Sequence, residues 1–396
     1  MNQTKQRCKC CGLPEYYTKI TFNQEGICNY CNFYAENKSV LENSSALKTA
    51  FQKKIENAKE KAKEAGAKYD CLVGFSGGKD STYIIYQLKK KYGMRVLAFT
   101  FDNGFSTEYG TKNIKNALEK LDIDHITFSL NDKELRKNYA TCVKFLHNFC
   151  AVCFHYMHYY SYLFAGQYQI PMIVNGRSRG QMLQCADSRK LLEPFETSYS
   201  LLEFEHQMFH GLEQKLYEAG KVDYLNDIRA EAVSYFAYHD IDEEDIMCFL
   251  EEEIGWVRSK GSSGHGDCYA HAMAENLSIQ KRGFPIRLGE LAVAVRRGKL
   301  TVEEMDYILE KDNNNFSVLE EAYRKKFGSR IDCDLTAVKD PTASYGASSL
   351  YAQQAAGYLT LAAVAKCRYH SFTESLPVFR ERKFVWLSEW KILHGT

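Results

Sequence analysis

Between residues 69 and 175 the chain alternates short apolar runs with stretches in which apolar positions recur every three or four residues. The apolar runs predict buried strands, and the amphipathic stretches predict helices. We expect strands at 69–75, 95–102, 125–129 and 171–175, and helices at 82–92, 109–121 and 132–146. Strands separated by helices favour a doubly wound parallel sheet with right-handed crossovers, so the predicted fold class is α/β.

Helical patterns flank this core on both sides. Residues 45–67 predict a charged, solvated helix, and the acidic run 240–253 predicts another. The last 65 residues predict a Tyr- and Ala-rich helix and a basic aromatic segment, which we expect to dock onto the body; RNA or a partner protein is the alternative ligand. The predicted domains are an N-terminal metal module at 1–40, a linker helix at 41–68, the α/β domain at 69–235 and a helical C-terminal region at 236–396.

Composition excludes several classes of protein. Of the 396 residues, 45% are hydrophobic and 26% are charged, which excludes a disordered or collagen-like chain. A net charge of +1 leaves no global basic field for nucleic acid. No apolar run approaches the roughly 20 residues that span a bilayer, and residues 1–10 contain no apolar signal region. We therefore expect a cytoplasmic protein with no membrane partner, in which the 14 cysteines are metal ligands, catalytic thiols or buried small residues.

Four cysteines near the N-terminus form the pattern C-x2-C-x16-C-x2-C; they are Cys8, Cys11, Cys28 and Cys31. This spacing is typical of a structural Zn²⁺ site with four thiolates, and four thiolates leave no open position for catalysis. The alternatives are two unrelated pairs or a redox dithiol. Cys10 is a spare thiol that could replace a neighbour.

A glycine-rich turn follows the first predicted strand directly. It reads Ser76-Gly77-Gly78-Lys79-Asp80-Ser81 and leads into an amphipathic helix. A strand, a glycine turn and a helix N-terminus point backbone N–H groups at an anion, and Lys79 adds a positive charge. Asp80 can hold Mg²⁺ through its carboxylate. The spacing is not that of a Walker A loop.

This hexapeptide resembles the PP-loop of the N-type ATP pyrophosphatases, which have an adenine nucleotide alpha hydrolase-like fold. The resemblance implies that ATP is cleaved between its α and β phosphates. The AMP part then activates a carbonyl or carboxyl oxygen, which a nitrogen or sulfur nucleophile displaces. Carried over by position, the residues that bind the leaving pyrophosphate are Ser76, Gly77, Gly78, Lys79, Asp80 and Ser81, with Lys79 and Asp80 as catalytic residues.

The resemblance also implies contacts between ATP and the ends of two other strands. Thr100, Phe101 and Asp102 end the second predicted strand, which lies beside the adenosine in this family. Gly176 and Arg177 begin a loop after the strand at 171–175, and this loop is similar to the second ATP-contacting loop of the family. On residue chemistry alone, a plain turn at 103–104 and an ordinary basic loop at 176–181 remain the alternatives.

A second cysteine pair, Cys150 and Cys153, lies between the third helix and the last strand. The pair is compatible with buried thiols, a persulfide or redox dithiol, an iron–sulfur cluster or a second zinc site. A cluster would need a further ligand, for which Cys185 and Cys268 are available. PP-loop tRNA thiolases carry a similar pair at a comparable separation. Protonated His155 or His158 could lower the pKa of such a thiol.

Within the superfamily, the chain looks most like the N-acetyl sugar amidotransferases of surface-polysaccharide clusters. The resemblance rests on residues 20–31, the PP-loop, Gly255-Trp256, and the stretches 260–268 and 296–304. It implies that nitrogen replaces an oxygen of a sugar-like acceptor. No glutaminase pattern is legible, so we expect a separate glutaminase partner to supply ammonia.

Two other functions remain open at the level of sequence. The first is a sulfurtransferase that acts on tRNA and uses Cys150 and Cys153 as persulfide carriers or cluster ligands. The second is a nucleotide-binding protein that has lost turnover. The group His265, Asp267, Cys268 and His271 could bind metal, position substrate or act as acid and base; alternatively, it is a turn into a helix capped by Asp267. The sequence leaves a homodimer possible.

Overall fold

The computed structural model describes residues 6–17, 20–131, 135, 139, 150–181, 230–259 and 266–311. Several predictions fall outside the described residues. They are most of the helix at 132–146, Cys185, His265 and the C-terminal 65 residues. The predicted domain boundaries stay predictions.

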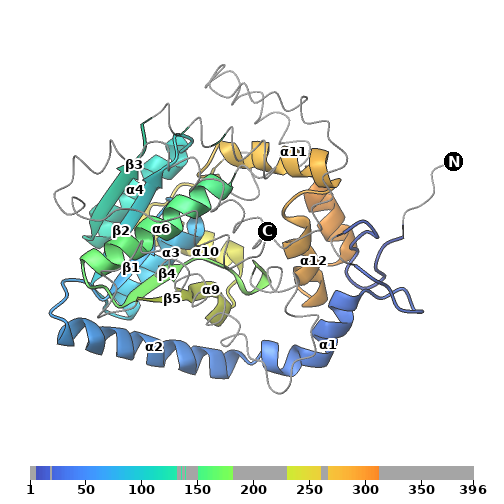
Figure 1. The fold of residues 1–396 in the computed structure, drawn as a ribbon, viewed down its shortest axis with the longest axis horizontal. Helices are drawn as coiled ribbons and strands as arrows, with labels where there is room; N and C mark the ends of the chain where they lie inside the picture. Colours follow the sequence, from blue (N-terminus) through green and yellow to red (C-terminus); the bar gives the residue numbers. More distant parts are fainter. Residues whose placement is uncertain are drawn as a thin grey trace, which may run out of the picture.

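The centre of the molecule is a five-stranded parallel sheet in the order β3-β2-β1-β4-β5 (Figure 1). The strands are β1 (Cys71–Gly74), β2 (Val96–Asp102), β3 (Asp124–Ser129), β4 (Met172–Asn175) and β5 (Glu231–Ser234). The first four match the predicted apolar runs, which confirms the α/β fold class. Strand β5 was missed because it is short and contains only two apolar residues, Ala232 and Val233.

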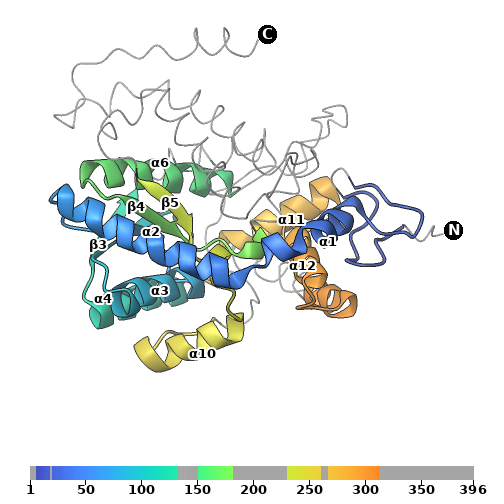
Figure 2. The same cartoon turned by 90° about the horizontal axis from the view of Figure 1, so that it is seen from below.

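Two hydrophobic cores lie on opposite faces of the sheet. Cys71 and Val73 of β1 belong to one core, whereas Leu72, between them, belongs to the other. This alternation follows from the two-residue period of a strand. The first core is covered by α3 (Lys79–Tyr86), its π-helical continuation η1 (Gln87–Lys91), α4 (Glu108–Leu121) and α10 (Glu243–Ile254). The second is covered by α6 (Ala151–Gln167), on the other side of the sheet (Figure 2).

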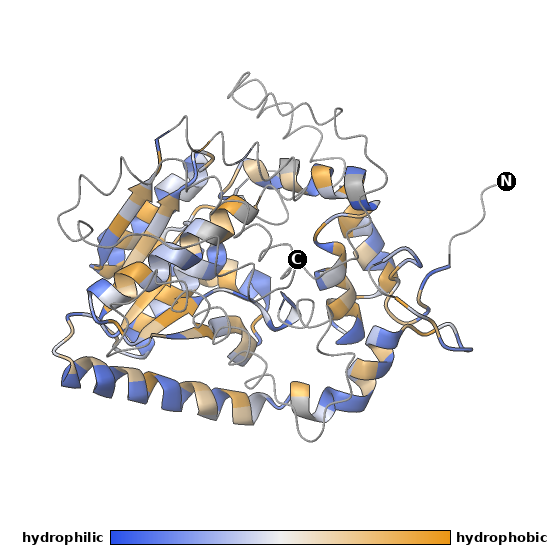
Figure 3. Cartoon of the chain, in the orientation of Figure 1, coloured by the Kyte–Doolittle hydropathy of each residue, from blue (hydrophilic) through white to orange (hydrophobic). Residues whose placement is uncertain are grey.

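The helix predicted to be solvated at 45–67 is in fact half-buried. Helix α2 (Ser44–Glu64) buries a stripe of residues that includes Phe51 and Ile55 in the first core, together with α9 (Tyr235–Tyr238). Figure 3 shows hydrophobic and hydrophilic positions alternating along α2, while the strands are largely hydrophobic. Helix α10 likewise buries Ile246, Leu250 and Ile254 and leaves its acidic residues exposed. Most residues of α2 and α10 are polar, so their apolar stripes were not evident from composition. A narrow apolar stripe on one side is nevertheless enough for a helix to pack against a core.

The N-terminal module packs against helices from the far end of the described chain. Helix α1 (Asn29–Leu41) and the cysteine loops before it contact α12 (Leu288–Arg296) and residues between α11 (Ala270–Arg282) and α12. Within the part of the chain that the structure describes, no helix has the length and apolar character needed to cross a membrane.

Candidate functional site

The predicted phosphate loop lies at the carboxyl end of β1 and leads into α3. Gly78 is the N-cap of α3, and its N–H donates to Ser76 Oγ over 3.3 Å. The hydroxyls of Ser76 and Ser81 lie 3.3 Å apart across the loop. The loop therefore has the folded form expected of an anion cradle, with the N-terminus of an eight-residue helix behind it.

Gly77 is the residue that makes this loop shape possible. Its φ is +78°, and a Cβ at this position would lie 2.2 Å from the carbonyl oxygen of Gly110. On the other side, Trp256 Nε1 donates to the Gly77 carbonyl oxygen over 3.0 Å. Trp256 reaches the loop because Gly255 ends α10 in a left-handed conformation. In the sequence, Gly255-Trp256 stood out only as part of a resemblance, and no local pattern indicated its contact with Gly77.

Lys79 keeps its positive charge in a largely buried position. Its Nζ lies 3.2 Å from Asp80 Oδ2 and 3.6 Å from Glu243 Oε2, and its side chain is 14% exposed. Burial lowers the pKa of Lys79, but the carboxylates of Asp80 and Glu243 outweigh burial, so the pKa is raised. The site therefore holds a permanent cation next to the loop. In the sequence, Glu243 was one of several acidic residues at 240–253, and nothing in that run predicted its contact with Lys79.

The three residues predicted at the end of β2 point in different directions. Thr100 donates its hydroxyl to the Phe75 carbonyl oxygen over 2.5 Å and so ties β2 to the start of the loop. Phe101 is buried and stacks on Tyr156, with ring centroids 5.2 Å apart. Asp102 is exposed at the strand end and accepts a hydrogen bond from Gly104 N. Of the three side chains, that of Asp102 is the one left at the open edge.

The loop after β4 meets the phosphate loop. A Cβ on Gly176 would lie 3.2 Å from Asp80 Cβ, so the two loops are in contact there. The Arg177 guanidinium lies over the Phe154 ring at 5.7 Å. Arg179, in contrast, is 1% exposed and pairs with Glu42 Oε2 at 2.8 Å. The start of the predicted loop therefore lies against the phosphate loop, and Arg179 anchors the loop to Glu42.

Of the two further cysteines that the sequence offered as ligands, the structure places Cys268 near Cys150 and Cys153, while Cys185 lies outside the described residues. Asn103 Nδ2 donates to Cys153 Sγ at 3.5 Å and lies 3.7 Å from Cys268 Sγ. The Tyr139 hydroxyl is 3.3 Å from Cys153 Sγ. Cys150, at the start of α6, lies close enough for the charges of the other two cysteines to raise its pKa. We call Cys150, Cys153 and Cys268 the sulfur triad.

Asn103 orients its amide toward the triad. Its Oδ1 accepts the backbone N–H of Phe105 over 2.8 Å, which turns the NH₂ group toward the two sulfurs. From the sequence, residues 103–104 were named only as a plain turn, the alternative to nucleotide contacts at the end of the preceding strand. A polar residue just beyond the carboxyl end of a parallel strand is the signal that could have identified Asn103.

Burial keeps the triad thiols protonated when they bind no metal. Burial raises the pKa of Cys268 to about 12, and it also raises the pKa values of Cys150 and Cys153. The expectation that His158 lowers a thiol pKa is wrong, because burial lowers the pKa of His158 itself to about 3 and leaves the ring neutral. A metal or cluster would deprotonate such thiols directly.

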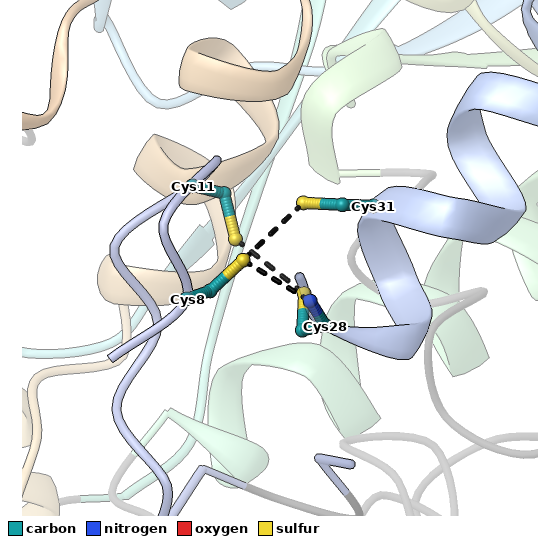
Figure 4. Close-up of side chains that lie close together, drawn as sticks. All are labelled: Cys8, Cys11, Cys28 and Cys31. Atoms are coloured by element: carbon teal, nitrogen blue, oxygen red, sulfur yellow. Dashed lines mark hydrogen bonds between the residues drawn. The ribbon is translucent and has the colours of Figure 1, made fainter. Parts of the chain in front are cut away.

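The four N-terminal cysteines form the predicted metal group (Figure 4). Their sulfur atoms all lie within 4.8 Å of one another, and every one of the four residues is buried. Cys8 Sγ is 3.8 Å from Cys31 Sγ, and Cys11 Sγ is 3.7 Å from Cys28 Sγ. A tetrahedral zinc with Zn–S bonds of about 2.3 Å separates its sulfurs by about 3.8 Å, so the group fits Zn²⁺.

The spare thiol, Cys10, is exposed and lies outside this group. The four cysteines of the metal group pack in one hydrophobic cluster with Leu291 of α12 and with Met305. Hydrogen bonds to Cys28 and Cys31 lower the pKa of Cys11, and the positive charge of Arg296 lowers it further. Zinc as the identity of the metal stays a prediction.

Two comparisons with known proteins rest on sequence. Residues 70–143, which contain β1, the phosphate loop, β2 and β3, match the family model of the queuosine biosynthesis protein QueC. The uncharacterized protein MJ1599 of Methanocaldococcus jannaschii is 22% identical over 274 residues, which cover 69% of this chain and 84% of that protein.

Three solved structures are similar at low levels. The U34-tRNA thiolase NcsA from Methanococcus maripaludis, with its [4Fe-4S] cluster, aligns over 77% of this chain and 88% of its own, at 16% identity and a TM-score of 0.34. A predicted tRNA methyltransferase subunit from M. jannaschii covers 55% and 91% at 15% identity, and NMN synthetase from Francisella tularensis covers 60% and 95% at 18%. Both have a TM-score of 0.28. Scores of this size transfer no residue or activity to this chain.

Proposed function

We propose that this chain, a QueC-like member of the PP-loop ATP pyrophosphatase superfamily by its residues 70–143, is an ATP-dependent sulfurtransferase. ATP reacts with an oxygen of the acceptor to form an adenylated acceptor and pyrophosphate. A sulfide equivalent then forms the new bond to carbon, and AMP leaves with the acceptor oxygen. Hydrosulfide supplies the sulfur at the oxidation level of the product, so this step needs neither an oxidant nor a reductant.

The first half of the reaction is supported by the charges around the phosphate loop. Pyrophosphate is a strongly anionic leaving group, and Lys79 stays charged beside the loop. The loop N–H groups and the N-terminus of α3 add partial positive charge. Removal of one such group typically costs about 3 kcal/mol of transition-state stabilisation. Asp80 would hold the Mg²⁺ that supplies further neutralising charge.

The observation that carries the choice of sulfur is the sulfur triad. Cys268 comes from a segment far along the chain, yet its sulfur and that of Cys153 lie around one Asn103 amide at the carboxyl edge of the sheet. A reaction that transfers nitrogen does not require three cysteines to lie close together beside the end of β2. Sulfur transfer can use them, because thiols can carry persulfide sulfur or ligate an iron–sulfur cluster.

The triad residues fit a cluster better than a free dithiol. Their burial and raised pKa values disfavour the thiolate that a persulfide carrier needs. Asn103 and Tyr139 supply an N–H and an O–H that stabilise ligating sulfur. Three cysteines would hold a four-iron cluster and leave one iron to bind a non-protein sulfur ligand.

The amidotransferase function, with a sugar-like acceptor and a separate glutaminase, stays a prediction, and one experiment compares it with sulfur transfer. The protein is purified without air, its iron and acid-labile sulfide are measured, and AMP and pyrophosphate release is followed with hydrosulfide or with ammonia. We test tRNA and nucleotide-linked sugars as acceptors. We expect a brown protein that absorbs at ~400 nm and turns over with hydrosulfide.

Matched variants make the test specific. Cys268→Ser, Cys150→Ser and Cys153→Ser should each lose iron and sulfur transfer while keeping the N-terminal metal. Cys248→Ser, at an exposed thiol on α10, should behave like the wild type. A colourless protein that turns over with ammonia alone would establish the amidotransferase instead. Release of ADP and phosphate would refute cleavage between the α and β phosphates.

A further inference from the structure

The residue before Cys268 faces the phosphate loop. Residues 266–269 are attached to the segment after β2 by backbone hydrogen bonds, from Thr107 N to the Asp267 carbonyl oxygen at 3.0 Å and from Tyr269 N to the Phe105 carbonyl oxygen at 2.9 Å. An isolated antiparallel bridge pairs Ser106 with Cys268. Cys268 Sγ lies 3.7 Å from Asn103 Nδ2, whereas Asp267 Oδ2 lies next to the backbone of Gly78. Cys268 turns toward the sulfur triad, and Asp267 turns toward the loop.

Two glycines accommodate Asp267. A Cβ on Gly78 would lie 3.2 Å from Asp267 Oδ2, so the carboxylate is next to the loop backbone. A Cβ on Gly110 would lie 3.1 Å from the Asp267 carbonyl oxygen and 3.3 Å from its Cα, so α4 approaches the Asp267 backbone just as closely. The position of this carboxylate is therefore set by close packing.

A capping role does not explain Asp267. The N-cap of α11 is Tyr269, which makes no side-chain capping bond. Among the described residues, no hydrogen bond or ion pair to the Asp267 carboxylate is found. The carboxylate also raises the pKa of Cys268, which is unfavourable for a neighbouring thiolate. Its position therefore calls for a ligand.

A carboxylate beside an anion-binding loop repels the phosphates of ATP unless a cation lies between them. Mg²⁺ is bound in phosphate sites by one or two carboxylates together with phosphate oxygens and water. Asp80, which follows Lys79 at the start of α3, supplies one carboxylate on the same loop. Asp267 approaches the loop from a different segment of the chain.

We propose that Asp267 is a second carboxylate of the nucleotide site and binds the Mg²⁺ that accompanies the pyrophosphate part of ATP. This inference rests on the proposed ATP chemistry. It makes the dipeptide Asp267-Cys268 the direct connection between the two halves of the site, since one residue faces the leaving group and the next belongs to the sulfur triad.

The sign of a binding change tests this role. We measure ATP binding to full-length protein by calorimetry, once with Mg²⁺ and once with a chelator. Asp267→Asn should weaken binding about tenfold with Mg²⁺, which corresponds to about 1.4 kcal/mol. With the chelator it should bind ATP as well as or better than the wild type, because a repulsive charge is gone. Asp245→Asn, at an exposed position on α10, is the control and should change neither value.

Equal weakening with and without Mg²⁺ would show a structural role and overturn the proposal, as would unchanged binding in Mg²⁺. Asp267→Glu keeps the charge and should stay within about threefold of the wild type in Mg²⁺; a loss as large as that of Asp267→Asn would also count against the proposal. Failure of the proposed function looks different, because the wild type itself would then bind no ATP or release no pyrophosphate.

Discussion

Trp256 donates its indole N–H to the carbonyl oxygen of Gly77 over 3.0 Å, and the two residues are 179 positions apart in the chain. The indole is 9% exposed, so little water reaches this bond. Trp256, just after the end of α10, thus holds the phosphate loop through the backbone of Gly77.

Replacement of Trp256 by Phe should loosen the loop. The aromatic ring is largely kept, but the Gly77 carbonyl oxygen loses a partner in a buried place, which typically costs about 1–3 kcal/mol. We expect a lower free energy of unfolding in a denaturant titration and weaker ATP binding. Tyr86→Phe, which removes an exposed hydrogen bond to Glu253, is the control and should have little effect. Unchanged ATP binding in Trp256→Phe would show that this bond does not shape the loop.

A methyl group at Gly77 should abolish nucleotide binding. The new Cβ would meet the Gly110 carbonyl oxygen at 2.2 Å, and that oxygen is a backbone atom of α4 that cannot move without shifting the helix. Gly66 is the matched control because it also has a positive φ, of +65°, but has no atom within 4 Å of a new Cβ. Gly66→Ala should cost only about 1–2 kcal/mol of left-handed backbone strain and keep ATP binding. Similar ATP affinities in the two variants would contradict the predicted clash.

Metal analysis should find one zinc per chain at the N-terminal cysteines. Cys28→Ser with Cys31→Ser removes two of the four ligands, so the double variant should lose zinc and lower the thermal midpoint. The loss should extend to the packing against α12, because the metal group and Leu291 share one hydrophobic cluster. Cys10→Ser should keep both zinc and stability, since this thiol is exposed. Full zinc in the double variant would mean that other ligands bind it.

The iron content of the sulfur triad should depend on the side chain at position 103. Asn103→Asp keeps the side-chain size but replaces the NH₂ group that faces Cys153 and Cys268 with a carboxylate oxygen. Repulsion between this charge and ligating thiolates should lower iron content, and Asn103→Ala should have a smaller effect. Iron and zinc are measured together, and zinc should not change. If Asn103→Asp kept the iron content of the wild type, Asn103 would have no role in holding the metal.

Acid should destabilise the fold in part through His239. Its ring stacks on Tyr235 with centroids 4.3 Å apart, and burial lowers its pKa to about 4. The unfolded chain, in which the pKa is about 6.5, then binds more protons than the folded chain between these values. This contribution to stability is therefore complete above pH ~6.5 and is lost as the pH falls toward 4. Unfolding titrations at several pH values should show a shallower acid loss for His239→Phe than for the wild type.

Local features of this protein were readable from the sequence. The strand, glycine turn and helix around Gly77 lie within about twenty residues, and their pattern follows from the periods of strands and helices. The four N-terminal cysteines were equally readable, because the spacing of each pair allows it to wrap one edge of a metal ion. In both places the interacting residues are close in the chain, so spacing alone limits the geometry.

The path of the chain decided the rest. Strand β5 carries too few apolar residues to show a period, and it is a strand because β4 offers it a parallel partner. The buried face of α2 became visible only through Phe51 in the first core, since its exposed charges dominate the composition. Sequence patterns report the average character of a segment, whereas burial depends on which neighbour covers it.

The composition of the site shows the same division. Lys79 and Asp80 could be named from the motif, but Cys268, Asp267 and Trp256 reach the loop or the triad from more than a hundred residues away. Their approach depends on how the segment after α10 returns to the carboxyl edge of the sheet, where the antiparallel bridge at Ser106 fixes it. By itself the sequence determined a glycine-rich loop after a strand of an α/β sheet and a group of four cysteines that could hold a metal. Only the tertiary structure decided that Cys268 joins Cys150 and Cys153. Residue spacing predicts contacts between neighbours in the chain, whereas Cys268 comes close only because the chain folds back to the edge of the sheet.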